Sequence, residues 1–589
     1  SWYRIITICC NYESICWHTH FMSYYSSTNV SHISRGETNN LLVVYIETTV
    51  NLKTLKNIIN IGLCVIDLSI GKSIVYETIS KLDDKNYSLD EVYRFIHIHN
   101  PTEIVISMTN SEFTKQGLSK YFEVDESIIH FIEKTEPRYS KLSYQKTLLE
   151  KVYPCRGVLS AVEYIDMEFY PHALISFIIA LDFAYSHNES IIKKIEKPEI
   201  WEQKGSLVLT NNSVSQLNIV SSPNNSYGKF NSLLSVMDNT STAIGKRKLK
   251  DRLLNPIVDE TILNIRYDTI SSMMSNQEGN RLYKSFETVL ERVSDIERLH
   301  RKISLKLIQP SDFVSLDISY DSIKDMIDLC KKSRCKLLHS LVPDSAILDN
   351  LYNFICYYKE KFNMDEICKY HLDKINGSFY NNGVYDDVDS VKEVIDTNTQ
   401  RFNIICKKLS DLTEKGSNFV KLDKTEKEGY FLNITEKRSQ LLKKRFVNTK
   451  YCIIKIDNDF SIDPRELEFK KIRHNTVKIT CSRIQELGTK IRTGRDKIGD
   501  ICREKFIEIL GDIDIRYISG LKKMSDFVGI IDVYKSAAKT AVKYGYTRPS
   551  ITNDKSSYID TEGIRHPIIE RIQTDIEYVT NDLVIGKSD

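Results

Sequence analysis

Glycine and proline are scarce in this sequence, which has 22 glycines and 12 prolines among 589 residues. So few turn-forming residues argue against disorder and against a protein built mainly of turns, and they favour long helices. An excess of one charge is also missing, because 81 basic and 79 acidic residues leave a formal net charge of +2. Any basic surface that binds nucleic acid must therefore be confined to one part of the molecule.

A framework of cysteine pairs is absent, as are a membrane-spanning apolar run and a signal peptide. The 13 cysteines are scattered from Cys9 to Cys502. This pattern predicts an intracellular, reducing compartment (nucleus, cytoplasm, mitochondrion or viral factory are not distinguished) and no membrane partner. The chain begins at Ser1, and we expect it to be a piece of a longer protein.

The patch richest in cysteine and histidine comprises Cys9, Cys10, Cys16, His18 and His20. Its spacing does not match the usual paired zinc ligands, so we predict no metal site and leave residues 1–40 unassigned. No ordered Ser/His/Asp or Cys/His set and no pair of carboxylates indicates catalysis, and we predict no catalytic residue.

A small α/β domain is predicted for residues 41–160. Short runs rich in β-branched residues predict strands at 42–46, 61–68, 73–76 and 104–106, and a helix is expected around 89–97. After about residue 174 the apolar residues recur at helical spacing. The sequence therefore predicts a multidomain, mainly α protein with one small α/β domain.

Two stretches of the helical part carry a heptad pattern typical of a coiled coil. The first consists of Val388, Val391, Ile395, Asn398, Phe402, Ile405, Leu409 and Leu412, and the second of Ile484, Leu487, Ile491, Gly494, Ile498 and Ile501. Asn398 either fixes the register from within the seam or faces solvent. Two strands are expected between the stretches, at 429–434 and 451–456. We therefore predict two antiparallel arms with a small β-containing tip.

The tip is the most basic segment of the chain. Residues 421–450 contain nine basic and four acidic residues, a formal charge of +5, and three more cations follow near 470. Such cations neutralise phosphates and give sequence-independent DNA affinity, although most charge runs are simply solvated faces. The candidate DNA-binding residues are Lys421, Lys424, Lys427, Lys437, Arg438, Lys443, Lys444, Arg445, Lys450, Lys470, Lys471 and Arg473.

The most specific motif is Leu233-Leu234-Ser235-Val236-Met237-Asp238-Asn239-Thr240. It is followed by Gly245-Lys246-Arg247-Lys248-Leu249-Lys250, Leu253-Leu254-Asn255-Pro256-Ile257, Arg266, Asp295-Ile296-Glu297-Arg298-Leu299 and Gln309-Pro310-Ser311-Asp312-Phe313. In this order the pieces resemble the core signature of the MutS family of DNA mismatch repair proteins. Glu428-Gly429-Tyr430-Phe431-Leu432-Asn433-Ile434 is similar to the family's clamp strand, and Arg565-His566-Pro567-Ile568-Ile569-Glu570 to the motif that opens its ATPase domain. A composition rich in Ile, Lys, Asn and Tyr suits the family's viral and mitochondrial branch.

The resemblance implies a domain order from the connector to the start of the ATPase. The connector would be RNase-H-like, the core would be a helical lever with coiled-coil arms, and a clamp would form the tip. An incomplete P-loop ATPase sheet would follow. The implied domains are 41–160 (connector), 161–385 (core and lever), 386–420 (ascending arm), 421–475 (clamp), 476–550 (descending arm and return to the core) and 551–589 (start of the ATPase).

The resemblance further implies that the full-length parent is a homodimeric ATPase that uses ATP and Mg and binds double-stranded DNA. The present sequence contains no Walker A or Walker B motif. Gly586-Lys587-Ser588 does not qualify, because Asn581 stands where the loop needs its first glycine. We therefore expect no intact cofactor site and no ATP hydrolysis by this chain. The phenylalanine-x-glutamate motif that probes mismatches has no counterpart in residues 1–40, and His566 is expected to shape the backbone.

Two alternatives remain open at this stage. One is a MutS-like DNA clamp for recombination or genome maintenance without mismatch recognition. The other is a structural helical scaffold whose basic tip binds acidic proteins.

Overall fold

The structure is a computed structural model that describes residues 38–586 except 51–56, 82, 155–156, 158, 202–206, 208, 210, 222–227, 278–279, 415, 417, 426–428, 450–451, 474, 553–557 and 573–575. The chain is mainly helical with several small sheets, as predicted. It divides into two compact units, the described parts of 1–307, 315–351 and 516–589, and of 308–314 and 352–515.

The first unit contains a six-stranded mixed sheet in the order β5-β4-β1-β2-β3-β6. Strands β1, β2 and β3 are antiparallel neighbours, whereas β4 runs parallel to β1, β5 to β4, and β6 to β3. The strands are β1 (Asn40–Val50), β2 (Asn57–Asp67), β3 (Lys72–Ile79), β4 (Glu103–Thr109), β5 (Ile129–Ile132) and β6 (Glu199–Ile200). The four predicted strands are therefore confirmed.

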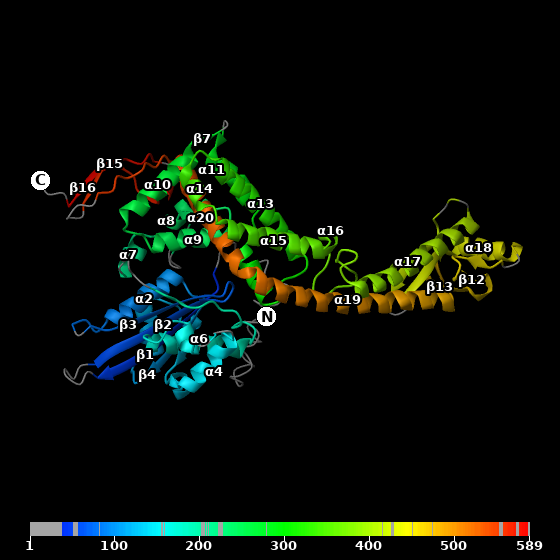
Figure 1. Cartoon of the computed structure of the whole chain (residues 1–589), viewed down its shortest axis with the longest axis horizontal. Coiled ribbons are helices and arrows are strands. Elements are labelled where there is room, and N and C mark those ends of the chain that lie inside the picture. Colours follow the sequence, from blue (N-terminus) through cyan, green and yellow to red (C-terminus); the bar gives the residue numbers. More distant parts are fainter. Residues whose placement is uncertain are drawn as a thin grey trace. The chain divides into compact units, whose positions relative to one another are not determined.

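Helices cover both faces of this sheet (Figure 1). Leu42, Val44 and Ile46 of β1 pack with residues of α2 (Tyr87–His99) and α3 (Lys115–Phe122). The alternate residues Leu41, Val43 and Tyr45 pack with α4 (Leu142–Val152) and α6 (Pro171–His187). A central strand buried on both faces explains why this segment is continuously apolar in sequence.

Helix α6 and strand β6 place part of this layer beyond the expected boundary at residue 160. Phe177, Ile178 and Leu181 of α6 belong to the same buried cluster as β1. Helix α6 is apolar nearly all round, which is typical of a helix buried in a core. Its periodicity therefore could not show whether it covers a sheet or other helices.

The rest of the first unit is helical, and α20 (Ile518–Tyr544) packs against α8, α9, α10, α11 and α12. The other helices of this unit are α5 (Ala161–Tyr164), α7 (Asn211–Gln216), α8 (Leu233–Met237), α9 (Ala243–Leu254), α10 (Glu260–Met274), α11 (Leu282–Leu290), α12 (Ile296–Ser304) and α14 (Lys336–Leu341). Helices α13 (Asp312–Lys332) and α15 (Ser345–Lys361) contribute residues to both units, and α16 (Met364–Ile367) belongs to the second. Two short strands, β7 (Asn276–Gln277) and β8 (Asn280–Arg281), form a hairpin between α10 and α11.

The C-terminal segment forms a hairpin of β15 (Ile559–Ile564) and β16 (Asn581–Ile585), with α21 (Ile569–Ile572) between the strands. Gly586 follows β16, whereas Lys587 and Ser588 lie outside the described residues. His566 accepts hydrogen bonds at Nδ1 from the backbone of Ile568 and Ile569, both 3.3 Å long. His566 therefore shapes the local backbone, as predicted. Among the described helices, none is long and apolar enough to cross a membrane.

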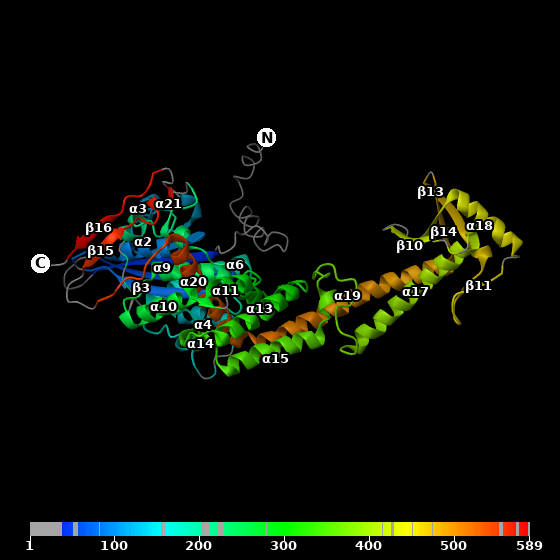
Figure 2. The ribbon, with the colours of Figure 1, turned by 90° about the horizontal axis from the view of Figure 1, so that it is seen from above.

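In the second unit, α17 (Asp386–Thr413) and α19 (Ser482–Arg516) lie side by side (Figures 1 and 2). The two heptad stretches lie on these helices, and most of their apolar residues are buried. A Cβ atom placed on Gly494 would lie 2.8 Å from Cγ1 of Ile395, so the absence of a side chain allows the helices to approach closely. The two predicted helical arms are thus present.

Asn398 is buried within this seam, so the solvent-facing alternative is wrong. Its Nδ2 donates to the Val394 carbonyl of the same helix at 2.7 Å. Its Oδ1 has no hydrogen-bond partner among the described residues. A buried, unsatisfied polar atom lowers stability.

Replacing Asn398 with leucine is therefore expected to stabilise the second unit by about 1 kcal/mol. Urea unfolding followed by circular dichroism would measure the gain as a higher midpoint at unchanged slope. Val394, on the same helix but 49% exposed, provides the control, because Val394→Leu fills no buried position. A loss of stability in Asn398→Leu would contradict this account of the seam.

The segment between the arms folds into a four-stranded sheet in the order β13-β14-β10-β9, with α18 packed on β10 and β14. The strands are β9 (Lys421–Thr425), β10 (Gly429–Thr435), β13 (Glu468–Arg473) and β14 (Thr476–Thr480), and the helix is α18 (Glu436–Asn448). The predicted strand at 429–434 is confirmed. The one expected at 451–456 is reduced to β11 (Ile454–Lys455), which pairs with β12 (Ser461–Ile462).

Candidate functional site

The predicted basic residues gather on three elements of the tip, β9, α18 and β13. Lys421 and Lys424 lie on β9, Lys437, Arg438, Lys443, Lys444 and Arg445 on α18, and Lys470, Lys471 and Arg473 on β13. Nothing is described of the Arg473 side chain, and Lys427 and Lys450 lie outside the described residues. One small domain thus brings together residues that are up to 52 positions apart in sequence.

Helix α18 carries five of these cations, and the packing of its other face on the sheet explains why they are exposed. Ser439, Leu442 and Phe446 form its buried stripe against the sheet. Lys437 and Lys444 are seven residues apart and therefore share the opposite, exposed face. No helix was predicted here, because a buried stripe of three residues does not establish a helical period.

The two cations that flank the buried stripe rest on aromatic rings. The Arg438 guanidinium lies 3.5 Å from the ring centroid of Phe419, and the Lys443 ammonium lies 4.7 Å from that of Phe469. Cation–π contact holds these groups at the surface while their stems cover apolar side chains. Burial of the stripe and these contacts orient the basic face of α18.

Pairing with carboxylates separates the candidates into two groups. Lys470 lies 3.2 Å from Glu468, and Lys471 lies 2.8 Å from Glu436. Lys443, Lys444 and Arg445 have no ion-pair partner in the part of the chain that the structure describes. The second group therefore keeps its full charge for an external anion, whereas the lysines of β13 are partly neutralised.

Two further cations of the tip were not among the predicted residues. Lys478 of β14 lies 5.0 Å from the ring centroid of Phe431. Arg465 precedes β13 and forms a forked ion pair with Asp463, with an Nη2–Oδ2 distance of 2.9 Å. Alternation of apolar and polar residues in 476–480 would have indicated an outward lysine on a strand at position 478.

Several residues of the family signature meet in the core of the first unit. Asp532 of α20 accepts hydrogen bonds from the Thr242 backbone at 2.8 Å and from the Thr242 hydroxyl at 2.7 Å. Arg247 forms a forked pair with Asp295, with both distances 2.8 Å, and also contacts Glu297 at 2.6 Å. These motif residues therefore fasten α9 to α20 and α12, a structural role.

A metal site is not indicated among the described residues. Among them, no group of three or more His, Cys, Asp or Glu side chains is arranged to hold a metal ion. The Cys/His patch near the N-terminus lies outside the described residues.

A histidine–carboxylate cluster lies beside the large sheet. His172, at the start of α6, contacts Glu47 at 2.9 Å through Nε2 and Glu77 at 3.3 Å through Nδ1. The Glu77 carboxylate also accepts the backbone N–H groups of His172 and Ala173. Burial opposes charge on both groups, but the hydrogen bonds and the opposite charges prevail, raising the pKa of His172 and lowering that of Glu77.

The first unit is therefore expected to lose stability on both sides of a mildly acidic optimum. The contribution from His172 is complete below its unfolded pKa of about 6.5 and is lost as pH rises through the raised folded pKa. The contribution from Glu77 is present above about pH 4.5 and is lost as pH falls through the lowered folded pKa. Thermal unfolding of wild type and His172→Gln at several pH values would show the alkaline loss only in wild type. Equal pH profiles would contradict this assignment.

Comparison with known proteins finds one matching family model and several related proteins. A family model described as MutS domain III matches residues 212–538. A putative DNA mismatch repair protein MutS homologue of Acanthamoeba polyphaga mimivirus is 29% identical over 96% of this chain and 53% of its own length. The DNA mismatch repair protein MutS of Caldanaerobacter subterraneus subsp. tengcongensis is 24% identical over 90% of the chain and 54% of its own length.

A mitochondrial DNA mismatch repair protein MutS homologue of Sarcophyton glaucum is 24% identical over 77% of the chain and 44% of its own length. The relatives thus include a viral and a mitochondrial protein. The chain spans about half the length of the curated relatives that it matches.

Proposed function

Because this chain belongs to the MutS family, we propose that it is the connector, lever and clamp portion of a DNA mismatch repair protein. In this proposal the tip domain binds the backbone of duplex DNA without reading its sequence. Phosphates are contacted by cations, and such contacts position a protein on the duplex without specifying bases.

One observation carries the proposal: the unpaired cations Lys443, Lys444 and Arg445 lie exposed on α18. Lys421 and Lys424 of β9 and Lys437 of α18 add to the same domain and are also exposed. The chain as a whole is nearly neutral, with a formal charge of +2. A concentrated basic surface on a neutral chain favours a polyanionic partner, and the family's relatives are named for DNA mismatch repair.

The other parts take the roles that family membership suggests. The six-stranded sheet and its helices would be the connector, for which we propose an RNase-H-like fold. Helices α17 and α19 would be the arms of the lever, and the hairpin of β15 and β16 would begin the ATPase domain. ATP and Mg binding, ATP hydrolysis and homodimer formation are proposed for the full-length protein, in which the ATPase domain would be complete.

Fluorescence anisotropy of this chain with labelled duplexes, one matched and one carrying a single mismatch, tests the proposal across a salt series. We expect binding that weakens steeply with salt and is equal for both duplexes, because backbone contacts release counterions and read no bases. Absence of binding at low salt would contradict a DNA-binding tip. A clear preference for the mismatched duplex would contradict backbone-only recognition.

A further inference from the structure

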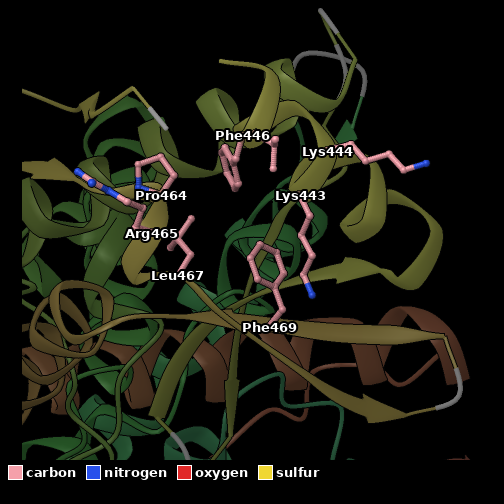
Figure 3. Close-up of a pocket in the computed structure, with 8 residues that line it drawn as sticks. Lys443, Lys444, Phe446, Pro464, Arg465, Leu467 and Phe469 are labelled. Atoms are coloured by element: carbon pink, nitrogen blue, oxygen red, sulfur yellow. The ribbon is translucent and has the colours of Figure 1, made fainter. Parts of the chain in front are cut away.

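A groove of about 540 Å³ lies on the tip between α18 and the segment that leads into β13 (Figure 3). Its lining is mixed in character. Apolar side chains of Phe446, Leu467 and Phe469 gather around one space, and Pro464 lies beside them (Figure 3). Lys443, Lys444 and Arg465 are the charged members of the lining. The groove thus has an apolar floor and a basic rim.

Val447 completes the apolar lining and is 59% exposed, although it stands on a helix rich in charge. An apolar group that packed on Val447 would remove its exposed side chain from water, which is favourable. Leu441 on the same helix is similarly exposed, at 53%, but does not line the groove. The two residues therefore differ in position while matching in exposure and type.

The rim is asymmetric in charge. On the α18 side, Lys443 and Lys444 have no described ion-pair partner, and Arg445 follows them. On the opposite side, Arg465 is paired with Asp463, and Glu468 is paired with Lys470. An anionic ligand would therefore be drawn to the α18 wall, and an apolar group beside its charges would reach the floor.

We propose that this groove binds an acidic peptide segment that carries an apolar anchor residue, supplied by a partner protein. Carboxylates of the segment would pair with Lys443 and Lys444, and the anchor would pack on Val447, Phe446 and Leu467. Peptide recognition of this kind combines a buried apolar anchor with a rim of charge. Duplex DNA meets the basic rim equally well, but its bases are stacked inside the helix and offer no apolar group to the floor.

Peptide binding by this groove does not require DNA binding by the tip, although both would use the same lysines. If both hold, peptide and duplex compete for Lys443 and Lys444. A partner protein could then release the tip from DNA, or be excluded by it. The anchor on the floor is the feature that distinguishes peptide binding from phosphate binding.

The test uses the whole chain and a fluorescein-labelled peptide in which leucine and phenylalanine are flanked on both sides by aspartates. The control peptide has serines in place of the two apolar residues. Anisotropy is measured for wild type, Val447→Asp and Leu441→Asp, each also with a labelled duplex. Both variants add the same charge at an exposed position of α18, so general electrostatic effects are matched.

We expect Val447→Asp to weaken binding of the leucine–phenylalanine peptide by about tenfold or more, the loss of one buried anchor contact. Leu441→Asp should weaken it by no more than about threefold, as a surface charge change does. The serine peptide should bind more weakly than the parent and respond equally to both variants. Circular dichroism spectra that match wild type would establish that both variants are folded.

Three results would overturn the proposal. Equal effects of the two variants, or equal affinity for the two peptides, would leave only general attraction of acidic chains to a basic face. A selective loss of duplex affinity in Val447→Asp without peptide binding would make the groove a nucleic-acid site. A different result, the absence of duplex binding by the wild-type chain with the peptide results as expected, would contradict the proposed function but not the groove assignment.

Discussion

Replacing Asp532 with alanine is expected to destabilise the first unit by about 3–5 kcal/mol, the typical cost of breaking a buried ion pair from one side. Asp532 and Lys535 lie 3.0 Å apart, and both side chains are fully buried. The substitution leaves the Lys535 ammonium without its counter-charge. It also removes the acceptor for the backbone N–H groups of Ser241 and Thr242.

The expected loss is large because the same residues join distant parts of the chain. Lys535 donates to the Asn239 carbonyl at 2.6 Å and to the Ser241 hydroxyl at 2.9 Å. Without Asp532, the turn between α8 and α9 would keep its bonds to Lys535, Ser536 and Thr540 but lose its carboxylate attachment to α20. Thermal and urea unfolding followed by circular dichroism would measure the change, and limited proteolysis would detect a loosened α8–α9 turn.

Asp526 provides a matched control on the same helix. Its carboxylate pairs with Lys248 at 2.8 Å, but its side chain is 52% exposed. Exposed ion pairs contribute little, so Asp526→Ala should change stability by less than about 0.5 kcal/mol. If the two variants unfolded alike, the buried pair would not be the fastening that its geometry indicates.

Replacing Lys444 and Arg445 together with alanine is expected to weaken duplex binding about tenfold to a hundredfold at low salt. It should also reduce the slope of log affinity against log salt by about two. Each cation that contacts a phosphate releases close to one counterion, so removing two such cations should lower the slope by about two. Fluorescence anisotropy across a salt series measures both quantities, and the slope separates lost phosphate contacts from partial unfolding.

Lys470 and Lys471 form the control pair for this experiment. Both are exposed on β13 and were predicted with equal weight, but each already lies beside a glutamate. Their joint replacement with alanine also frees Glu468 and Glu436 to repel phosphates, yet we expect the slope to fall by less than one. If the β13 pair had the larger effect, DNA would lie against β13 rather than along α18.

The long-range architecture was predictable where one physical signal dominates. A continuous apolar run predicted the buried strand β1, and a heptad repeat predicted α17 and α19, because burial on a fixed period leaves a clear pattern in sequence. Helix α18 was missed because three buried residues do not establish a period. The extension of the sheet layer through α6 was missed because a helix apolar on all sides shows no direction of packing.

The candidate residues were predictable as a basic segment but not as a surface. Counting charge identified Lys443, Lys444 and Lys470 alike, and only the structure separates the unpaired lysines of α18 from the paired lysine of β13. The groove could not be predicted at all, since its two walls are about twenty positions apart and one of them includes Arg465, outside the basic segment. Likewise, the sequence presented Asp532 as an ordinary residue of a helix.

The close approach of α17 and α19 has a mechanical consequence. Two rods that are packed against each other resist shear at the contact, and together they bend less than either rod alone. Gly494 allows such close packing against Ile395, and a helix pair held in this way is expected to behave as a stiff beam. A force that moves the sheet at one end of the helix pair would therefore tilt the other end, because the pair itself bends little.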